Sequence, residues 1–175
     1  SYLRHIVFVL EMSALSLFII ALARPQSSSK NKEINVEGID IVLAMDISSS
    51  MLAADLKPDR LEASKAVASD FVKGRPNDRM GLIVFSGETF TQVPLTTDHG
   101  MMLNMLQDMK CGMLEDGTAI GDGLASAVSR LKDSEAISKV VILLTDGDNN
   151  AGSIDPNTAA EMAKLFGIRV YTIGA

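Results

Sequence analysis

Cysteine is nearly absent from this sequence, and positive charge is in the minority. Cys111 is the only cysteine among 175 residues, which excludes a disulfide within the chain and a cage of thiolate metal ligands. Lysine and arginine total 16 against 22 aspartates and glutamates, and the formal net charge is -6. Nucleic-acid binding depends on clustered basic side chains that neutralise phosphates, and no such cluster occurs here. We therefore expect neither a disulfide-stapled domain nor a nucleic-acid-binding protein.

Long apolar runs are also scarce, and the main one lies near the beginning of the chain. Residues 6–23 are apolar except for one glutamate and two serines. As a helix that rises about 1.5 Å per residue, this stretch is just long enough to cross a bilayer. We therefore predict one transmembrane helix with its flank over residues 1–25, followed by a polar linker over residues 26–35.

A cleaved signal peptide is the main alternative to this membrane helix, because Ala21-Leu22-Ala23 forms a cleavage-type motif after the apolar stretch. A buried core helix fits less well, since the few polar residues do not form a polar face. The chain begins at Ser1 rather than at methionine, and it ends at Ala175 directly after an apolar strand pattern. We therefore expect an excerpt of a longer protein, with the C-terminal part of its last domain truncated.

From residue 36 onward, apolar runs typical of buried strands alternate with segments that have a helical spacing of apolar residues. The predicted strands cover residues 39–45, 80–85, 89–95, 140–144 and 169–173, and the predicted helices cover 60–72, 98–109, 122–131 and 156–166. The turn at 86–88 is too short for a crossover, so the strand after it is predicted to be antiparallel. The pattern predicts an α/β domain over residues 36–175, with a Rossmann-like, doubly wound and mostly parallel sheet that has one antiparallel edge strand.

Three polar stretches, far apart in the chain, follow predicted strands or lead into a helix. Their oxygen-bearing residues are Asp46, Ser48, Ser50, Thr118 and Asp146. Open α/β sheets bind ligands at the carboxyl ends of their strands, and a set of oxygen-only donors suits a hard divalent cation. The sequence therefore predicts one metal site formed by these five residues.

The first stretch has the form D-x-S-x-S. In an extended backbone the side chains of residues 46, 48 and 50 share one side, and Ser49 points away. Taken alone, this motif favours a helix-capping turn. We interpret Asp59 and Arg60 as exposed charges at a helix end, each of modest worth for stability.

Enzyme interpretations fit these residues poorly. Haloacid-dehalogenase phosphatases also begin with an aspartate at a strand end, but they require a second acid two residues later, where this chain has Ser48. Residues 112–118 have the spacing of a phosphate-binding loop, yet they lack its lysine and carry two acids that repel phosphate. No G-x-S-x-G nucleophile elbow occurs. We predict a protein that is not an enzyme, with a metal-dependent hydrolase and a structural membrane protein with a vestigial metal site as the alternatives.

The joint pattern resembles the metal-ion-dependent adhesion site (MIDAS) of von Willebrand factor type A (VWA) domains. In that family the first strand ends in D-x-S-x-S, a threonine comes from a later loop, and an aspartate ends a further core strand, in the order found here. A narrower resemblance, to the membrane-anchored aerotolerance (Bat) branch of the superfamily, rests on five further segments. These are residues 21–26 (ALARPQ), 58–61 (PDRL), 78–82 (DRMGL), 94–98 (PLTTD) and 148–152 (DNNAG).

The resemblance implies a cation-dependent binding function. Asp46 would carry the charge that anchors Mg²⁺, with Mn²⁺ or Ca²⁺ as alternatives, and Asp146 would bind through water. The hydroxyls of Ser48, Ser50 and Thr118 would ligate the ion directly. Such neutral ligands leave the ion electrophilic, so it favours the carboxylate of an aspartate or glutamate on a protein partner. The implied partners are sister VWA membrane proteins and a MoxR-type AAA+ ATPase, in a scaffold that serves stress tolerance.

The signals for the side of the membrane disagree. One arginine precedes the apolar stretch and three basic residues follow it, which favours a cytoplasmic domain because positive charge is enriched on the cytoplasmic side. The resemblance implies a further basic loop upstream, and such a loop reverses the balance. We therefore expect a bacterial inner-membrane protein whose VWA domain is periplasmic.

Overall fold

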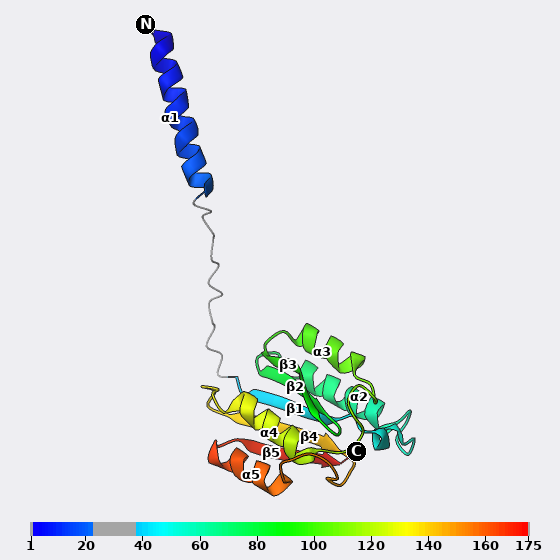
Figure 1. Ribbon diagram of the computed structural model, residues 1–175. Coiled ribbons are helices and arrows are strands. Elements are labelled where there is room, and N and C mark those ends of the chain that lie inside the picture. The colour runs from blue at the N-terminus through cyan, green and yellow to red at the C-terminus, as the bar shows by residue number, and fades with distance from the viewer. Residues whose placement is uncertain (1, 23–37, 175) are drawn as a thin grey trace. The chain divides into compact units, whose positions relative to one another are not determined.

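The computed structural model describes residues 2–22 and 38–174 (Figure 1). Contacts between residues divide the chain into two units, Ser1–Ile34 and Asn35–Ala175, and each unit is described by itself. The predicted linker over residues 26–35 lies outside the described residues.

The first unit contains helix α1 (Tyr2–Leu22), where the sequence predicts a helix. Large apolar side chains such as Phe8 and Val9 are exposed along it, and the helix also carries Arg4 and Glu11. Within the described residues, no helix is both long and apolar enough to cross a membrane. The predicted helix is therefore confirmed, whereas its transmembrane character is not.

The second unit is built on one five-stranded sheet, whose strands lie in the order β3-β2-β1-β4-β5. The strands are β1 (Asp40–Asp46), β2 (Arg79–Phe85), β3 (Thr89–Thr96), β4 (Lys139–Thr145) and β5 (Arg169–Gly174). β1 pairs in parallel with β2 and β4, β4 pairs in parallel with β5, and β3 is antiparallel to β2 at one edge. The predicted α/β class and the antiparallel edge strand are therefore confirmed.

Helices cover both faces of this sheet (Figure 1). On one face lie α2 (Arg60–Lys73) and α3 (His99–Asp108), and on the other lie α4 (Ile120–Leu131) and α5 (Pro156–Leu165). Three of these helices are capped by an aspartate whose carboxylate accepts a hydrogen bond from a backbone N–H of the first turn. The capping residues are Asp59, Asp98 and Asp155. Because such caps satisfy donors that have no partner within the helix, they favour a helix start at these positions.

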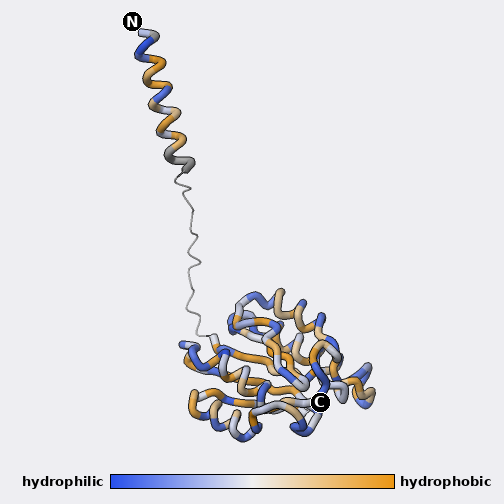
Figure 2. Tube along the Cα trace, viewed as in Figure 1, coloured by the Kyte–Doolittle hydropathy of each residue, from blue (hydrophilic) through white to orange (hydrophobic). Residues whose placement is uncertain are grey.

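The three central strands β2, β1 and β4 are buried on both faces of the sheet, and alternate residues of β1 belong to different cores. Leu43 and Met45 of β1 pack in the core beneath α2 and α3, whereas Val42 and Ala44 pack in the core beneath α4 and α5. Successive side chains of a strand point to opposite faces, so a strand covered on both faces needs apolar residues at every position. Figure 2 shows the resulting hydrophobic colour along the strands in the middle of the domain. This is why the apolar runs of the sequence locate the strands closely.

The two strands that carry the candidate site end side by side. β1 and β4 pair in parallel along their length, so Asp46 and Thr145 lie at the same edge of the sheet. The backbone remains extended at Ser48, and Ser49–Leu52 then form a short 3-10 helix, η1. The extended backbone predicted for the whole D-x-S-x-S motif is therefore wrong from Ser49 onward, whereas the Ser48 and Ser50 side chains do meet.

Gly121 marks a close approach between α4 and the loop after β4. A Cβ atom at this position would lie 1.8 Å from the carbonyl oxygen of Ile154, whereas one at Gly74 would lie 3.5 Å from its nearest neighbour. Gly121→Ala is expected to reduce the free energy of unfolding by at least about 2 kcal/mol, because overpacking forces the two segments apart. Gly74→Ala, the matched control, is expected to change it by less than about 1 kcal/mol. Chemical denaturation measures both, and equal losses would contradict this close packing.

Candidate metal centre

Asp46 is the buried centre of the candidate site. It is the last residue of β1 and is 0% exposed. Its Oδ1 atom accepts a hydrogen bond from the backbone N–H of Ser48 (2.9 Å), and its Oδ2 atom accepts one from the hydroxyl of Thr145 (2.7 Å). Burial raises the pKa of the Asp46 carboxyl above its ordinary value, while the hydrogen bonds from Ser48 and Thr145 oppose that shift. The neighbours therefore compensate the charge of this carboxylate only in part.

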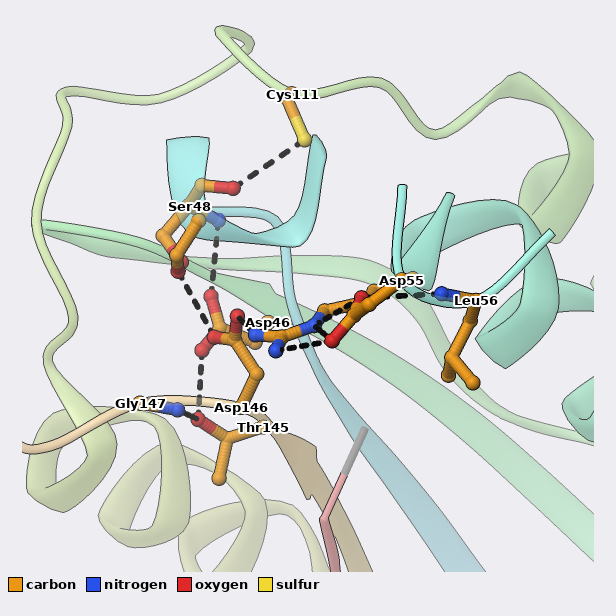
Figure 3. Close-up of polar contacts among 10 residues, drawn as sticks. Asp46, Ser48, Asp55, Leu56, Cys111, Thr145, Asp146 and Gly147 are labelled. Carbon is orange, nitrogen blue, oxygen red and sulfur yellow. Dashed lines mark hydrogen bonds and ion pairs between the residues drawn. The ribbon is translucent and has the colours of Figure 1, made fainter. Parts of the chain in front are cut away.

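The hydrogen-bonded network continues from Asp46 to three more of the predicted ligands (Figure 3). The hydroxyl oxygens of Ser48 and Ser50 are 3.0 Å apart, and the Ser50 hydroxyl donates to Oδ1 of Asp146 over 2.8 Å. Asp146 follows β4 directly, and its side chain is 1% exposed. The turn after β1 and the end of β4 thus bring together four of the five predicted residues: Asp46, Ser48, Ser50 and Asp146.

Thr118 approaches this network from the loop before α4. It is 4% exposed, and its hydroxyl oxygen lies 3.6 Å from the position that a Cβ atom would take on Gly147, the residue after Asp146. The backbone N–H of Thr118 donates to the side-chain oxygen of Asn150 (2.8 Å), and its carbonyl oxygen accepts from the backbone N–H of Asn150 (3.1 Å). Thr118 is therefore held beside the Asp146 loop by Asn150, a residue that the sequence prediction did not include.

Ser49 joins the first loop to the loop that carries Thr118. Its hydroxyl donates to Oδ2 of Asp116 (2.8 Å), and its backbone N–H donates to Oδ1 of the same carboxylate (3.1 Å). These hydrogen bonds hold the pKa of the Asp116 carboxyl below its ordinary value. The extended backbone assumed in the prediction left Ser49 without a partner, whereas the turn of η1 gives it Asp116.

Arg60, the first residue of α2, is the largest departure from the sequence interpretation. Its guanidinium forms an ion pair with Asp146 and a two-point contact with Asp55. Only 23% of the Arg60 side chain is exposed, so it is not the exposed helix-end charge that the sequence indicated. Hydrogen bonds to Asp55 first, and then to Asp146, raise the pKa of Arg60 above its ordinary value. No local pattern predicts this contact, because Arg60 and Asp146 are 86 residues apart in the sequence.

The donor set fits a hard divalent cation. The five candidate ligands offer two carboxylates and three hydroxyls, and the described part of the chain contains no group of three or more histidine, cysteine, aspartate or glutamate side chains suited to a metal. Oxygens on short side chains suit Mg²⁺, which takes six oxygen ligands and keeps several waters. Burial, and to a lesser degree repulsion from Asp146, raises the pKa of Asp46, so a cation near both acids would relieve a like-charge contact.

Comparisons with known proteins agree with this architecture. A family model for the von Willebrand factor type A domain matches residues 40–175 of this chain. The crystal structure of an aerotolerance-related membrane protein from Bacteroides fragilis has a TM-score of 0.73 and 36% identity, over 78% of this chain and 67% of that protein. BatB from Bacteroides thetaiotaomicron has a TM-score of 0.70 and 37% identity, over 78% of this chain and 66% of that protein.

More distant similarity extends to a protein with a metal-occupied motif. Proximal thread matrix protein 1 from the mussel byssus, with a zinc-occupied MIDAS motif, has a TM-score of 0.69 and 27% identity, over 78% of this chain and 35% of that protein. An uncharacterized protein of Borreliella burgdorferi is 37% identical over 163 residues, which cover 92% of this chain and 48% of that protein. The chain spans about half the length of the curated relatives it matches.

The hydrogen bonds between Ser49 and Asp116 can be tested through the pH dependence of stability. Because they hold the pKa of Asp116 below its ordinary value of 3.8, the ionised carboxylate stabilises the folded state above about pH 4, and this contribution is lost as the pH falls through the lowered pKa. Asp116→Asn is therefore expected to lower the melting temperature near neutral pH and to lose this effect in strong acid.

Ser49→Ala is expected to reproduce this pH-dependent loss, whereas Ser49→Thr, which keeps the hydroxyl, should remain close to the wild type. Thermal melts of the three variants across the acidic range make the measurement. A deficit in Asp116→Asn that persists unchanged into acid would contradict a role for the ionised carboxylate.

Proposed function

The chain belongs to the von Willebrand factor type A domain family, and on that premise we propose that it binds protein partners through a divalent cation at the carboxyl edge of its sheet. The proposed ligands are Asp46, Ser48, Ser50, Thr118 and Asp146. The observation that carries the proposal is the network that begins at the buried Asp46 carboxylate and reaches Asp146 through the two serines, in contacts of 2.9, 3.0 and 2.8 Å. These contacts support the proposal that oxygens from distant parts of the chain serve one ion.

The resemblance to the VWA adhesion site assigns each proposed ligand a role. Asp46 supplies negative charge from inside the fold, and Asp146 orients waters around the ion. The hydroxyls of Ser48, Ser50 and Thr118 supply neutral oxygens. A divalent ion bound by so few anionic ligands would keep a net positive charge and would attract a further anionic oxygen. The complementary group is the carboxylate of an aspartate or glutamate on a partner protein.

We propose Mg²⁺ as the resident ion, with Mn²⁺ or Ca²⁺ as substitutes. The all-oxygen donor set supports a hard ion, because carboxylate, hydroxyl and water oxygens suit Mg²⁺, Ca²⁺ and Mn²⁺. The mussel byssus protein with zinc in its MIDAS motif supports a divalent ion in a related fold.

Hydrogen bonds engage the two carboxylates among the proposed ligands. Asp46 accepts hydrogen bonds from Ser48 and Thr145, and Asp146 accepts them from Ser50 and Arg60. These contacts hold both carboxylates in fixed positions before any ligand binds, and this preorganisation supports a role for the pair as ligands of an ion.

The remaining parts of the proposal concern the membrane and the partners. We propose that residues 1–25 associate the chain with the bacterial inner membrane, that residues 26–35 form a linker, and that the VWA domain over residues 36–175 faces the periplasm. A similar protein of Bacteroides fragilis is named as a membrane protein, which supports membrane association. The resemblance to the Bat branch supports sister VWA proteins and a MoxR-type AAA+ ATPase as partners in a scaffold for stress tolerance.

Cation binding is tested by its effect on stability. A ligand that binds only the folded state stabilises it by about 2.7 kcal/mol when its free concentration is about 100 times its Kd. Mg²⁺ or Mn²⁺ is therefore expected to raise the melting temperature of the wild-type chain by several degrees, and Asp46→Ala is expected to abolish the rise. Asp108→Ala, which removes an exposed aspartate at the end of α3, is the matched control. An equal rise in Asp46→Ala would show that the ion binds elsewhere.

Partner binding is tested by affinity capture with wild-type and Asp46→Ala bait, each in Mg²⁺ and in EDTA. A partner that supplies a carboxylate to the ion is expected to be retained only by the wild-type bait in Mg²⁺. EDTA removes the cation, and Asp46→Ala removes a ligand that holds it. Mass spectrometry identifies what is retained. Partners recovered equally in all four conditions would refute cation-dependent adhesion.

A further inference from the structure

The guanidinium of Arg60 lies between two carboxylates that differ in burial. On one side, its Nε and Nη2 atoms donate to Oδ1 and Oδ2 of Asp55 over 2.8 and 2.6 Å. On the other side, its Nη1 atom donates to Oδ2 of Asp146. The Asp146 side chain is 1% exposed and the Asp55 side chain is 55% exposed. One guanidinium therefore joins a buried acid of the candidate site to an acid in contact with solvent.

From this geometry we propose that Arg60 is the built-in counter-ion of Asp146 and competes with the divalent cation for that carboxylate. The inference rests on the cation site proposed above and extends it, because it assigns the residue that sets the affinity of that site. In the metal-free protein Arg60 neutralises Asp146, and cation binding weakens or displaces this contact.

The competition follows from the environment of Asp146. A buried carboxylate is unfavourable unless hydrogen bonds or an opposite charge compensate it. Here Ser50 donates to Oδ1 and Arg60 donates to Oδ2, so both oxygens are engaged. A divalent ion whose waters bind the same carboxylate would also repel the guanidinium, and solvent screens this repulsion weakly at a largely buried site.

Asp55 gives Arg60 a second partner that does not depend on Asp146. The backbone N–H of Arg60 donates to the carbonyl oxygen of Ala53 (3.1 Å), which holds the base of the side chain near the loop that carries Asp55. The guanidinium is a planar fork with several donors, so Nε and Nη2 can stay on Asp55 while Nη1 leaves Asp146. Asp55 therefore favours the metal-bound state, because it keeps the displaced guanidinium paired.

A purely orienting role for Arg60 predicts the opposite outcome. If the ion pair served to hold Asp146 in the geometry that the cation requires, loss of Arg60 would weaken cation binding. If Arg60 competes with the cation, its loss strengthens binding, since the repulsion and the displaced ion pair both disappear. The sign of the change in affinity therefore separates the two roles.

The test is a titration of the 175-residue chain, kept in detergent, with Mn²⁺, followed by the electron paramagnetic resonance signal of the free ion. Arg60→Gln is expected to bind Mn²⁺ about tenfold more tightly than the wild type, a coupling of ordinary size between two interacting sites. Arg60→Lys, which keeps the charge, should remain within about threefold of the wild type. Asp55→Asn should bind several-fold more weakly, because Arg60 is then left with Asp146 as its carboxylate partner.

Arg75→Gln is the matched control, since it removes an arginine that pairs with Asp78 (3.2 Å) and takes no part in the candidate site. Its affinity for Mn²⁺ should equal that of the wild type. Wild-type binding with equal or weaker binding by Arg60→Gln would refute the competition and leave the cation site intact. Absence of Mn²⁺ binding by both proteins would refute the cation site and the competition together.

The counter-ion role is tested separately by melting the metal-free proteins in EDTA. Arg60→Gln is expected to lose more thermal stability than Arg75→Gln, because it leaves the Asp146 carboxylate buried without the guanidinium that neutralises it. Adding Asp146→Asn to Arg60→Gln is expected to recover more than half of that deficit. A melting temperature of Arg60→Gln equal to that of Arg75→Gln would refute the counter-ion role.

Discussion

The carboxylate of Asp46 lies at the end of the central strand and is 0% exposed, where a charge is unfavourable unless nearby donors or a cation compensate it. One of its donors comes from the turn that follows β1, and the other is the Thr145 hydroxyl of β4, 99 residues further along the chain. Both reach the carboxylate because β1 and β4 are parallel neighbours that end at the same edge of the sheet. The candidate site therefore depends on this strand pairing more than on any one loop.

Around that carboxylate, side-chain hydrogen bonds join the loops to one another, beside backbone hydrogen bonds between the same loops. Ser49 binds Asp116, and Asn150 binds the backbone of Thr118. Asp122, in the first turn of α4, accepts hydrogen bonds from the backbone N–H groups of residues 153 and 154. These contacts hold irregular segments in one arrangement before any ligand binds. Supporting contacts of this kind are what a preorganised binding site requires.

The balance of charge at this edge is negative but not uniformly so. The carboxylates of Asp46 and Asp146 belong to the candidate site, and Asp116 contacts its first loop through Ser49. Arg60 pairs with Asp146 and with the more exposed Asp55. The surplus of acids suits a divalent cation, whereas the positive charge of Arg60 reduces the negative potential at Asp146. Affinity at such a site reflects the difference between these two effects, so residues outside the set of ligands contribute to it.

Local sequence patterns were enough to predict the helices and strands and to nominate all five candidate ligands. A strand covered on both faces must be apolar throughout, so β1 and β4 were visible as apolar runs, and the acids that follow them were visible as polar residues at strand ends. Tertiary structure alone decided the turn of η1, the pairing of Ser49 with Asp116, and the contact of Arg60 with Asp146. The physical reason is that short-range periodicity records which face of an element is buried. The partner of a charged side chain is instead chosen by which distant segments the fold brings within hydrogen-bonding distance.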